Sequence, residues 1–250
     1  MLLAAGEVEC EYSRGRMRGN MTINNSENLL QSIMESLDRI RHIEPDDIPN
    51  IDLYMDQVTT FMDRKLRSSA RYPEEDKILT KTMINNYAKN DLLPPPVKKK
   101  YSKEHVLVLI FIYYYKNILS INDIQTLLHP ITERFFQNGE EFNLESIYRE
   151  VFSLEEETVE RMKEDIREKY GKAEGTFINA PADSVEFLRK FAFICELSFD
   201  VYMKKLLIEK LVDDLGREME KNTSAGKSEK KAKKDKEVKA DSNEEGTPVM

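Results

Sequence analysis

Residues 80–128 decide the fold that we expect for this chain, and they read TKTMINNYAKNDLLPPPVKKKYSKEHVLVLIFIYYYKNILSINDIQTLL. The stretch opens with an N-cap residue, Thr80, and with an amphipathic pattern that predicts a helix over Lys81–Asn90. The proline triplet 94–96 should end this helix, because proline lacks an amide hydrogen and forces the preceding residue out of the helical region. A lysine cluster and a long apolar segment follow this stop.

The residues after the prolines predict a small hairpin or extended wing over Pro94–Tyr101, followed by two helices. Ser102 is expected to cap the first helix, Lys103–Ile118, and Ser120 the second, Ile121–Leu128. This order of elements is typical of a winged helix-turn-helix: a helix, a proline stop, a lysine-rich wing and capped helices.

The rest of the chain also has helical periodicity, and its glycines and prolines mark the expected ends of helices. Ser26 and Asp52 are expected to cap two helices that precede residue 80. Later helices are expected over Glu141–Ser153, Leu154–Tyr170 and Asp183–Leu215. The expected breaks are a stop at Pro130, a loop over Gly171–Pro181 and an end at Gly216.

These elements predict an all-α fold with a small β wing and a C-terminal helical bundle. Residues 1–21 lack periodicity and are expected to be extraneous or disordered, with Met21 as the hypothesised natural start. A winged helix-turn-helix domain should span 22–131, and a helical domain 132–216. Residues 217–250 have few large apolar side chains and should form a disordered charged tail.

The charge distribution favours a partner for the middle of the chain, although the formal net charge is −8. Seven lysines and one acid lie between Lys77 and Lys103, whereas twenty acids and twelve bases lie between Glu133 and Gly216. A basic segment of this kind attracts phosphate.

Several classes of protein are not expected from this sequence. The two cysteines, Cys10 and Cys195, are far apart and have no neighbouring Cys/His cluster, so we expect no metal site and a reducing, cytoplasmic location. The longest apolar run, Val106–Tyr115, is too short to span a bilayer. No catalytic arrangement of side chains can be nominated, so the chain is predicted to be neither an enzyme nor a cofactor-binding protein.

The predicted helix over Lys81–Asn90 has the composition of a helix that reads DNA. Its apolar residues share one face, and amide and ammonium groups, which can bond base edges and phosphates, share the other. The predicted groove-facing residues are Lys81, Thr82, Asn85, Asn86 and Lys89, and the predicted phosphate contacts are Lys98, Lys99, Lys100 and Tyr101. A small packed helix beside a solvated lysine run explains the same spacing about as well.

The stretch also resembles the MerR-type helix-turn-helix family. The resemblance rests on Asn86-Tyr87, Asp91-Leu92-Leu93-Pro94-Pro95, Lys99-Lys100-Tyr101-Ser102, Leu109-Ile110-Phe111-Ile112, Leu119-Ser120-Ile121 and Ile124-Gln125-Thr126-Leu127-Leu128. From about Ile48 to Leu128 the chain is similar to a bacterial domain family of unknown function that carries this module.

This resemblance implies a transcription regulator that binds double-stranded DNA as a homodimer, with an unknown effector. The chain departs from the family in having Asn and Lys where arginines are common, and in a longer, glycine-free turn over Ser68–Leu79. An interaction module that keeps the winged fold without binding DNA is therefore the alternative hypothesis.

Overall fold

The computed structural model describes residues 28–38 and 42–241. The predictions made for residues 1–21, for the Ser26 cap and for residues 242–250 therefore lie outside the described residues. A helix over residues 28–38 comes first. It is followed by η1 (Pro45–Asp47), β1 (Leu53–Tyr54), α2 (Met55–Leu66), η2 (Arg67–Ser69), α3 (Lys81–Lys89), β2 (Lys100–Tyr101), α4 (Lys103–Tyr115), α5 (Ile121–Phe135), α6 (Leu144–Phe152), α7 (Glu155–Glu174) and α8 (Val185–Asp241).

The described part is mostly helical, in agreement with the predicted all-α class, and its only sheet pairs β1 with β2. The two strands are antiparallel, with Leu53 opposite Tyr101 and Tyr54 opposite Lys100. This pairing joins the residues just before α2 to the residues just before α4.

The main core is built around α4, in which every side chain from His105 to Ile112 is buried. A helix that is apolar on all sides must be covered on all sides, and α2, α3, α5 and α6 contribute the surrounding apolar side chains. The hydroxyl of Tyr148 in α6 donates to the backbone oxygen of Ile43 at 2.7 Å, which ties α6 to the segment that precedes β1.

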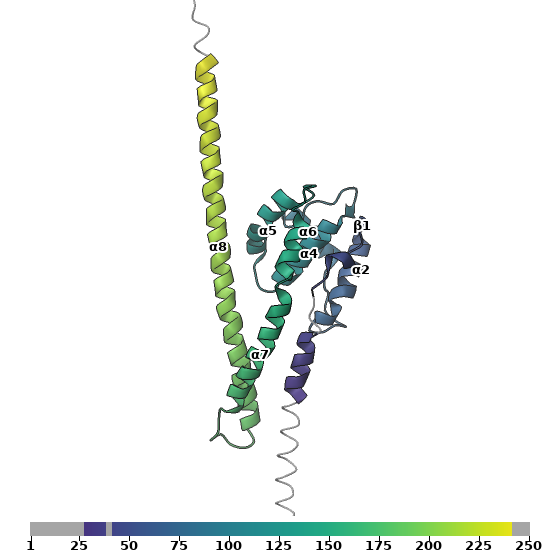
Figure 1. The fold of residues 1–250 in the computed structure, drawn as a ribbon, viewed down its shortest axis with the longest axis vertical. Helices are drawn as coiled ribbons and strands as arrows, with labels where there is room; N and C mark the ends of the chain where they lie inside the picture. The colour runs from purple at the N-terminus through teal and green to yellow at the C-terminus, as the bar shows by residue number, and fades with distance from the viewer. Residues whose placement is uncertain (1–27, 39–41, 242–250) are drawn as a thin grey trace, which may run out of the picture.

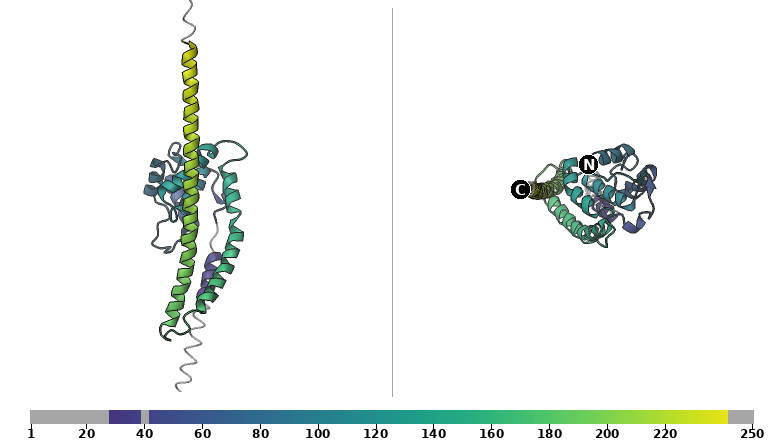
Figure 2. Two further views of the ribbon diagram at one scale, coloured as in Figure 1. Left: turned by 90° about the vertical axis from the view of Figure 1, so that its left-hand side faces the viewer. Right: turned by 90° about the horizontal axis from the view of Figure 1, so that it is seen from above.

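A smaller cluster joins three helices beside the main core. It is formed by Met34 from the helix over 28–38, Ile166 and Ala173 from α7, and Phe193 from α8. Figure 1 shows α8 as one long helix that leaves α7 near its base and runs alongside the main body. From the side, Figure 2 shows the same helix extending past the body.

The two cores group the helices differently from the predicted domains, which divide at residue 131. Helix α6 belongs to the main core, and the helix over 28–38 belongs to the smaller cluster. Val212 of α8 is also buried in the main core. The later helices therefore fold back over the earlier ones.

The predicted helix starts at Thr80, Ser102 and Ser120 are confirmed. The predicted cap at Asp52 is wrong, because the next two residues pair as strand β1 and Tyr54 is the N-cap of α2. The Tyr54 N–H is satisfied by the side-chain oxygen of Gln57 at 2.8 Å, so this helix start is stabilised from its third residue.

Three predicted helix ends are also wrong. Pro130 lies inside α5, where the Thr132 hydroxyl donates to the backbone oxygens of Leu128 and His129, each at 3.1 Å, and supports the turn around the proline. Gly171 lies inside α7, and the chain leaves this helix at Gly175.

The third wrong end is Gly216, which lies inside α8. One glycine within a helix costs only about 1 kcal/mol, and the Lys-, Glu- and Ala-rich residues that follow favour helix. Gly216 lies where α8 crosses α5, and a Cβ atom at this position would be 3.5 Å from Cγ2 of Thr126.

Candidate nucleic-acid interface

Helix α3 exposes the residues that its sequence predicts to be exposed. The Thr80 hydroxyl accepts the N–H of Met83 at 3.1 Å and fixes the first turn. Ile84 and Tyr87 are buried and hold the helix against the core. The exposed face carries Lys81, Thr82, Asn85, Asn86 and Lys89.

Within the described residues, most of these side chains have no internal partner. No ion pair or side-chain hydrogen bond engages Thr82, Asn85 or Lys89, and Asn86 accepts a bond only through its backbone oxygen. The side-chain amides of Asn85 and Asn86 and the ammonium of Lys89 are therefore free to bond a ligand.

The end of α3 is a tight left-handed cap. Asp91 has φ 54°, and the N–H of Leu92 donates to the backbone oxygen of Tyr87 at 3.0 Å, which is a Schellman-type closure. Leu92 and Leu93 are buried directly after it. The predicted proline stop is therefore reinforced by a cap that directs the chain into the lysine segment.

The lysine segment forms a two-residue turn whose backbone is strained. Val97 and Lys100 exchange backbone hydrogen bonds at 3.1 and 2.9 Å, and Lys98 and Lys99 between them have φ 50° and 66°. Positive φ at both central positions defines a type I′ turn, which normally contains asparagine and glycine. Both lysine side chains are exposed at the tip of this turn.

The start of α2 contacts both the lysine segment and the first turn of α3. Asp56 forms an ion pair with Lys81 of α3, and the Lys100 ammonium lies 5.2 Å from the centre of the Tyr54 ring. Tyr54 and Asp56 are two residues apart, so their Cα atoms can be separated by no more than about 7 Å. Lys81 and Lys100 are therefore both held at the start of α2, with the acid Asp56 beside Lys81.

Tyr101 differs from the other predicted contacts because the structure places it in the core. Its side chain is 3% exposed, and its ring packs edge-on against the His105 ring at a centroid distance of 5.5 Å. Burial raises the pKa of its hydroxyl. Tyr101 holds strand β2 to helix α4, whereas the lysines beside it reach solvent.

Buried His105 connects this strand to the proline segment, a role that the sequence did not suggest. Its Nδ1 accepts the N–H of Ser102 at 2.9 Å, which leaves the ring proton on Nε2, 3.4 Å from the backbone oxygen of Pro95. Burial lowers the pKa of the ring and keeps it neutral. His105 follows the Ser102 cap by three residues, which is the position of the second side chain in a capping box. This spacing was the one signal in the sequence for the role of His105.

Lys116 fixes the long segment that leads into α3. Its ammonium donates to the backbone oxygen of Ile78 at 2.9 Å and lies 4.8 Å from the centre of the Tyr113 ring. Burial lowers the pKa of this ammonium, and Asp76 opposes the shift. The connection from α2 to α3 is long, but it is anchored immediately before the Thr80 cap.

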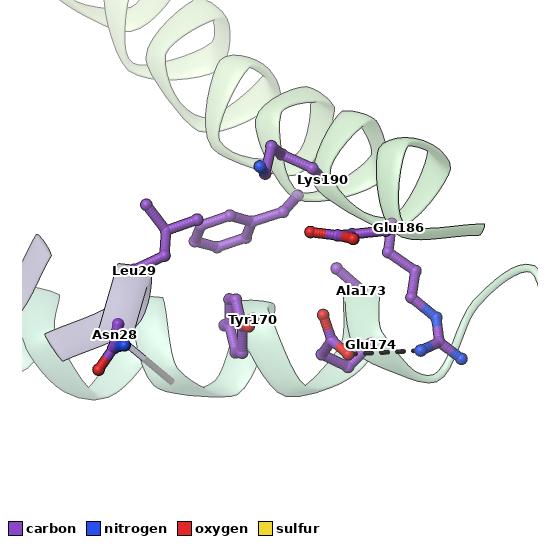
Figure 3. Close-up of a pocket in the computed structure, with 9 residues that line it drawn as sticks. Asn28, Leu29, Tyr170, Ala173, Glu174, Glu186 and Lys190 are labelled. Carbon is purple, nitrogen blue, oxygen red and sulfur yellow. Dashed lines mark hydrogen bonds and ion pairs between the residues drawn. The ribbon is translucent and has the colours of Figure 1, made fainter. Parts of the chain in front are cut away.

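A cavity lies in the smaller cluster, between the helix over 28–38, α7 and α8. It is a cavity of about 360 Å³ with an apolar floor and a charged rim (Figure 3). Arg189 on its rim is held by Glu174 at 3.5 Å. The cavity is lined by Asn28, Leu29, Tyr170, Ala173, Glu174, Glu186, Arg189, Lys190 and Phe193.

The residues that the structure describes contain no cluster of three or more His, Cys, Asp or Glu side chains that could hold a metal ion. None of their helices combines the length and the apolar character needed to cross a membrane.

The comparisons with known proteins identify one part of the chain. Residues 43–151 match the sequence model of a domain of unknown function, DUF1836. The match begins at Ile43 and ends within α6, so it covers the helices that surround α4 in the main core. The expectation that this part of the chain contains a domain of unknown function is therefore confirmed. No curated protein and no solved structure matches the chain.

Proposed function

We propose that residues 43–151 form a winged helix-turn-helix module that binds double-stranded DNA, and that the protein regulates transcription. Helices α2 and α3 would form the helix-turn-helix, and the turn at Lys98 and Lys99 would be the tip of the wing. The observation that carries the proposal is that exposed side chains of α3 and the exposed lysine turn both lie beside the start of α2.

The composition of these two segments supports different roles, with base contacts from α3 and phosphate contacts from the lysine turn. Asn85 and Asn86 carry amides, which suit adenine in the major groove, and Lys89 suits guanine or phosphate. Lys98 and Lys99 carry free charges on the tip of a turn, where they can approach a phosphate backbone without disturbing the core. Tyr101 supports the turn from within.

The strain in the lysine turn supports the same proposal. A left-handed conformation costs a non-glycine residue on the order of 1 kcal/mol, and two adjacent lysines adopt it here. Asparagine and glycine would form this turn more stably but would place no charge at its tip. Such a cost is typical of residues retained for binding.

A gel-shift series over increasing salt tests the proposal, with fragments of genomic DNA as probes. Affinity should fall steeply with salt, and replacing Lys98, Lys99 and Lys100 by Ala should lower the slope of log K against log salt by about 2.7. The matched control replaces three exposed lysines of α8, Lys204, Lys205 and Lys210, and should leave the slope unchanged.

The alternative function is an interaction module that keeps this fold without binding DNA. It is favoured by the ion pair between Lys81 and Asp56, which neutralises one of the predicted groove contacts, and by the lack of arginine on α3. Absence of any gel shift at roughly 50 mM salt would support the alternative and refute DNA binding.

A further inference from the structure

The cavity in the smaller cluster has the dimensions of a small-molecule site. Its volume of about 360 Å³ lies near the lower end of the range of roughly 300–1,000 Å³ that ligand pockets occupy. Its walls come from three segments that are far apart in the chain, namely the helix over 28–38, α7 and α8. A compact ligand can therefore be surrounded on several sides at once.

The floor of the cavity is apolar and aromatic. Tyr170 of α7 and Phe193 of α8 meet edge to face, with ring centroids 5.4 Å apart and ring planes at 90°. Phe193 and the neighbouring Ala173 are buried, and Leu29 comes from the helix over 28–38. Aromatic rings pack well against a further ring in offset or edge-on arrangements. The floor therefore suits an aromatic group.

The rim of the cavity carries two acids and two bases, and one pair of them is already engaged. Arg189 forms an ion pair with Glu174 at 3.5 Å, and its Nε donates to the backbone oxygen of Thr176 at 3.3 Å. Glu186 and Lys190 are exposed, and within the described residues neither takes part in an ion pair or a hydrogen bond through its side chain. One carboxylate and one ammonium are therefore available at the rim.

The two available charges are held close together. Glu186 and Lys190 are four residues apart on α8, a spacing that places their Cβ atoms about 6 Å from each other. Figure 3 shows both on the α8 side of the cavity, opposite Tyr170 on α7. A ligand that rests on the aromatic floor and carries opposite charges on neighbouring atoms can reach both.

We propose that this cavity binds a small zwitterion with an aromatic body, of the class of the free aromatic α-amino acids. The Lys190 ammonium pairs with the carboxylate of the ligand, and the Glu186 carboxylate accepts from its ammonium. The aromatic group lies against Tyr170 and Phe193. A ligand with a single charge would cover Glu186 or Lys190 without pairing it, and covering an unpaired charge costs free energy.

Ligand binding in this cavity does not depend on DNA binding. The residues that line the cavity all lie outside residues 43–151, which match the domain of unknown function. DNA binding by a protein that binds no zwitterion would refute this inference alone, and zwitterion binding by a protein that binds no DNA would refute the proposed function alone.

Isothermal titration calorimetry of the full chain tests the inference with three probes that share one aromatic body. They are L-phenylalanine, 2-phenylethylamine, which lacks the carboxylate, and 3-phenylpropionate, which lacks the ammonium. L-Phenylalanine should bind with a Kd below about 1 mM, as expected for a ligand of about a dozen heavy atoms. Each of the other two probes should bind at least about 10-fold more weakly, because it loses a charge-assisted contact.

Two substitutions at the rim assign each charge to its partner. Lys190→Gln should weaken binding of L-phenylalanine about 10-fold and should not weaken binding of 2-phenylethylamine. Glu186→Gln should weaken binding of L-phenylalanine to a similar extent and should not weaken binding of 3-phenylpropionate. Both side chains are exposed, so circular dichroism should show an unchanged helix content. The matched control is Lys210→Gln, an exposed lysine of α8 outside the cavity, which should leave all three affinities unchanged.

Four results would overturn the inference. The first is the absence of L-phenylalanine binding up to roughly 10 mM. The second and third are equal affinities for L-phenylalanine and for either singly charged probe, which would assign the cavity to an apolar anion or to an apolar cation. The fourth is an equal loss of affinity in Lys210→Gln, which would show that the rim charges are not specific contacts.

Discussion

Replacing the two strained lysines, as Lys98→Asn together with Lys99→Gly, should stabilise the protein and weaken its binding to DNA. The native φ values of 50° and 66° suit asparagine and glycine, which adopt the left-handed region with little strain. Relief of about 1 kcal/mol at each position is offset in part by the greater freedom of glycine in the unfolded chain. The net gain should be about 1 kcal/mol, or a rise in Tm of about 2–4 °C.

The same substitution removes two positive charges from the tip of the turn. If both lysines contact phosphate, the slope of log K against log salt should fall by about 1.8. Thermal unfolding followed by circular dichroism measures the first effect, and a salt series of gel shifts measures the second.

A double alanine variant at Lys98 and Lys99 is the matched control. It removes the same charges but keeps a Cβ atom at each positive φ, so it should reproduce the weaker binding without the rise in Tm. A lower Tm for the asparagine–glycine variant would refute the strain argument. An unchanged salt slope in both variants would refute the assignment of these lysines to phosphate.

Three further substitutions test separate parts of the structure. Asp56→Asn frees the ammonium of Lys81 and removes an acid that lies beside it, so gel shifts should show DNA affinity several-fold higher, with a larger gain at low salt. His105→Gln keeps an acceptor for the cap but cannot titrate, so it should remove part of the acid sensitivity of Tm. Gly216→Ala should raise Tm by about 2–4 °C, because alanine favours helix by up to about 1 kcal/mol and its Cβ atom would be in ordinary contact with Thr126.

The pH dependence at His105 has a defined sign. Its pKa is lowered in the folded protein, so the unfolded chain, with a pKa near 6.5, binds a proton first as the pH falls. The stability contributed by the neutral ring is complete above pH 6.5 and is lost as the pH falls towards the lowered pKa. A Tm profile below pH 6.5 that is identical in wild type and His105→Gln would contradict this assignment.

The controls for the other two substitutions are equally direct. Lys81→Ala should remove the part of the gain from Asp56→Asn that comes from the freed ammonium, and should leave the part that comes from the loss of an acid. A lower Tm in Gly216→Ala would mean that α5 and α8 approach more closely than the 3.5 Å contact indicates.

Local features of this fold were predictable from the sequence, and those that depend on packing were not. Thr80 and Ser120 each receive a backbone N–H three residues later, a contact that the order of residues alone specifies. The apolar residues of α3 were predicted correctly because a nine-residue helix has one buried face. Pro130 was misjudged as a helix end because the hydroxyl of Thr132 supports the turn around it. Gly216 was misjudged because α8 packs there on Thr126 of α5, which is distant in sequence.

In the candidate site too, the local features were predictable from the sequence and the features that depend on packing were not. The exposed residues of α3 follow from helical periodicity, but the link between Lys81 and Lys100 runs through Tyr54 and Asp56, some 25 to 45 residues earlier. The burial of Tyr101 depends on its ring contact with His105, which a pattern of lysines and aromatics does not reveal.

Helix α8 has a mechanical consequence, because it is buried at two separate points. Phe193 is fixed in the smaller cluster and Val212 in the main core, 19 positions apart, which corresponds to about 28 Å of helix. Over this lever arm, a tilt of about five degrees at Phe193 displaces the contact at Val212 by roughly 2.5 Å. A tilt of α8 at its base would therefore displace its contact with α5, which in turn packs on α4.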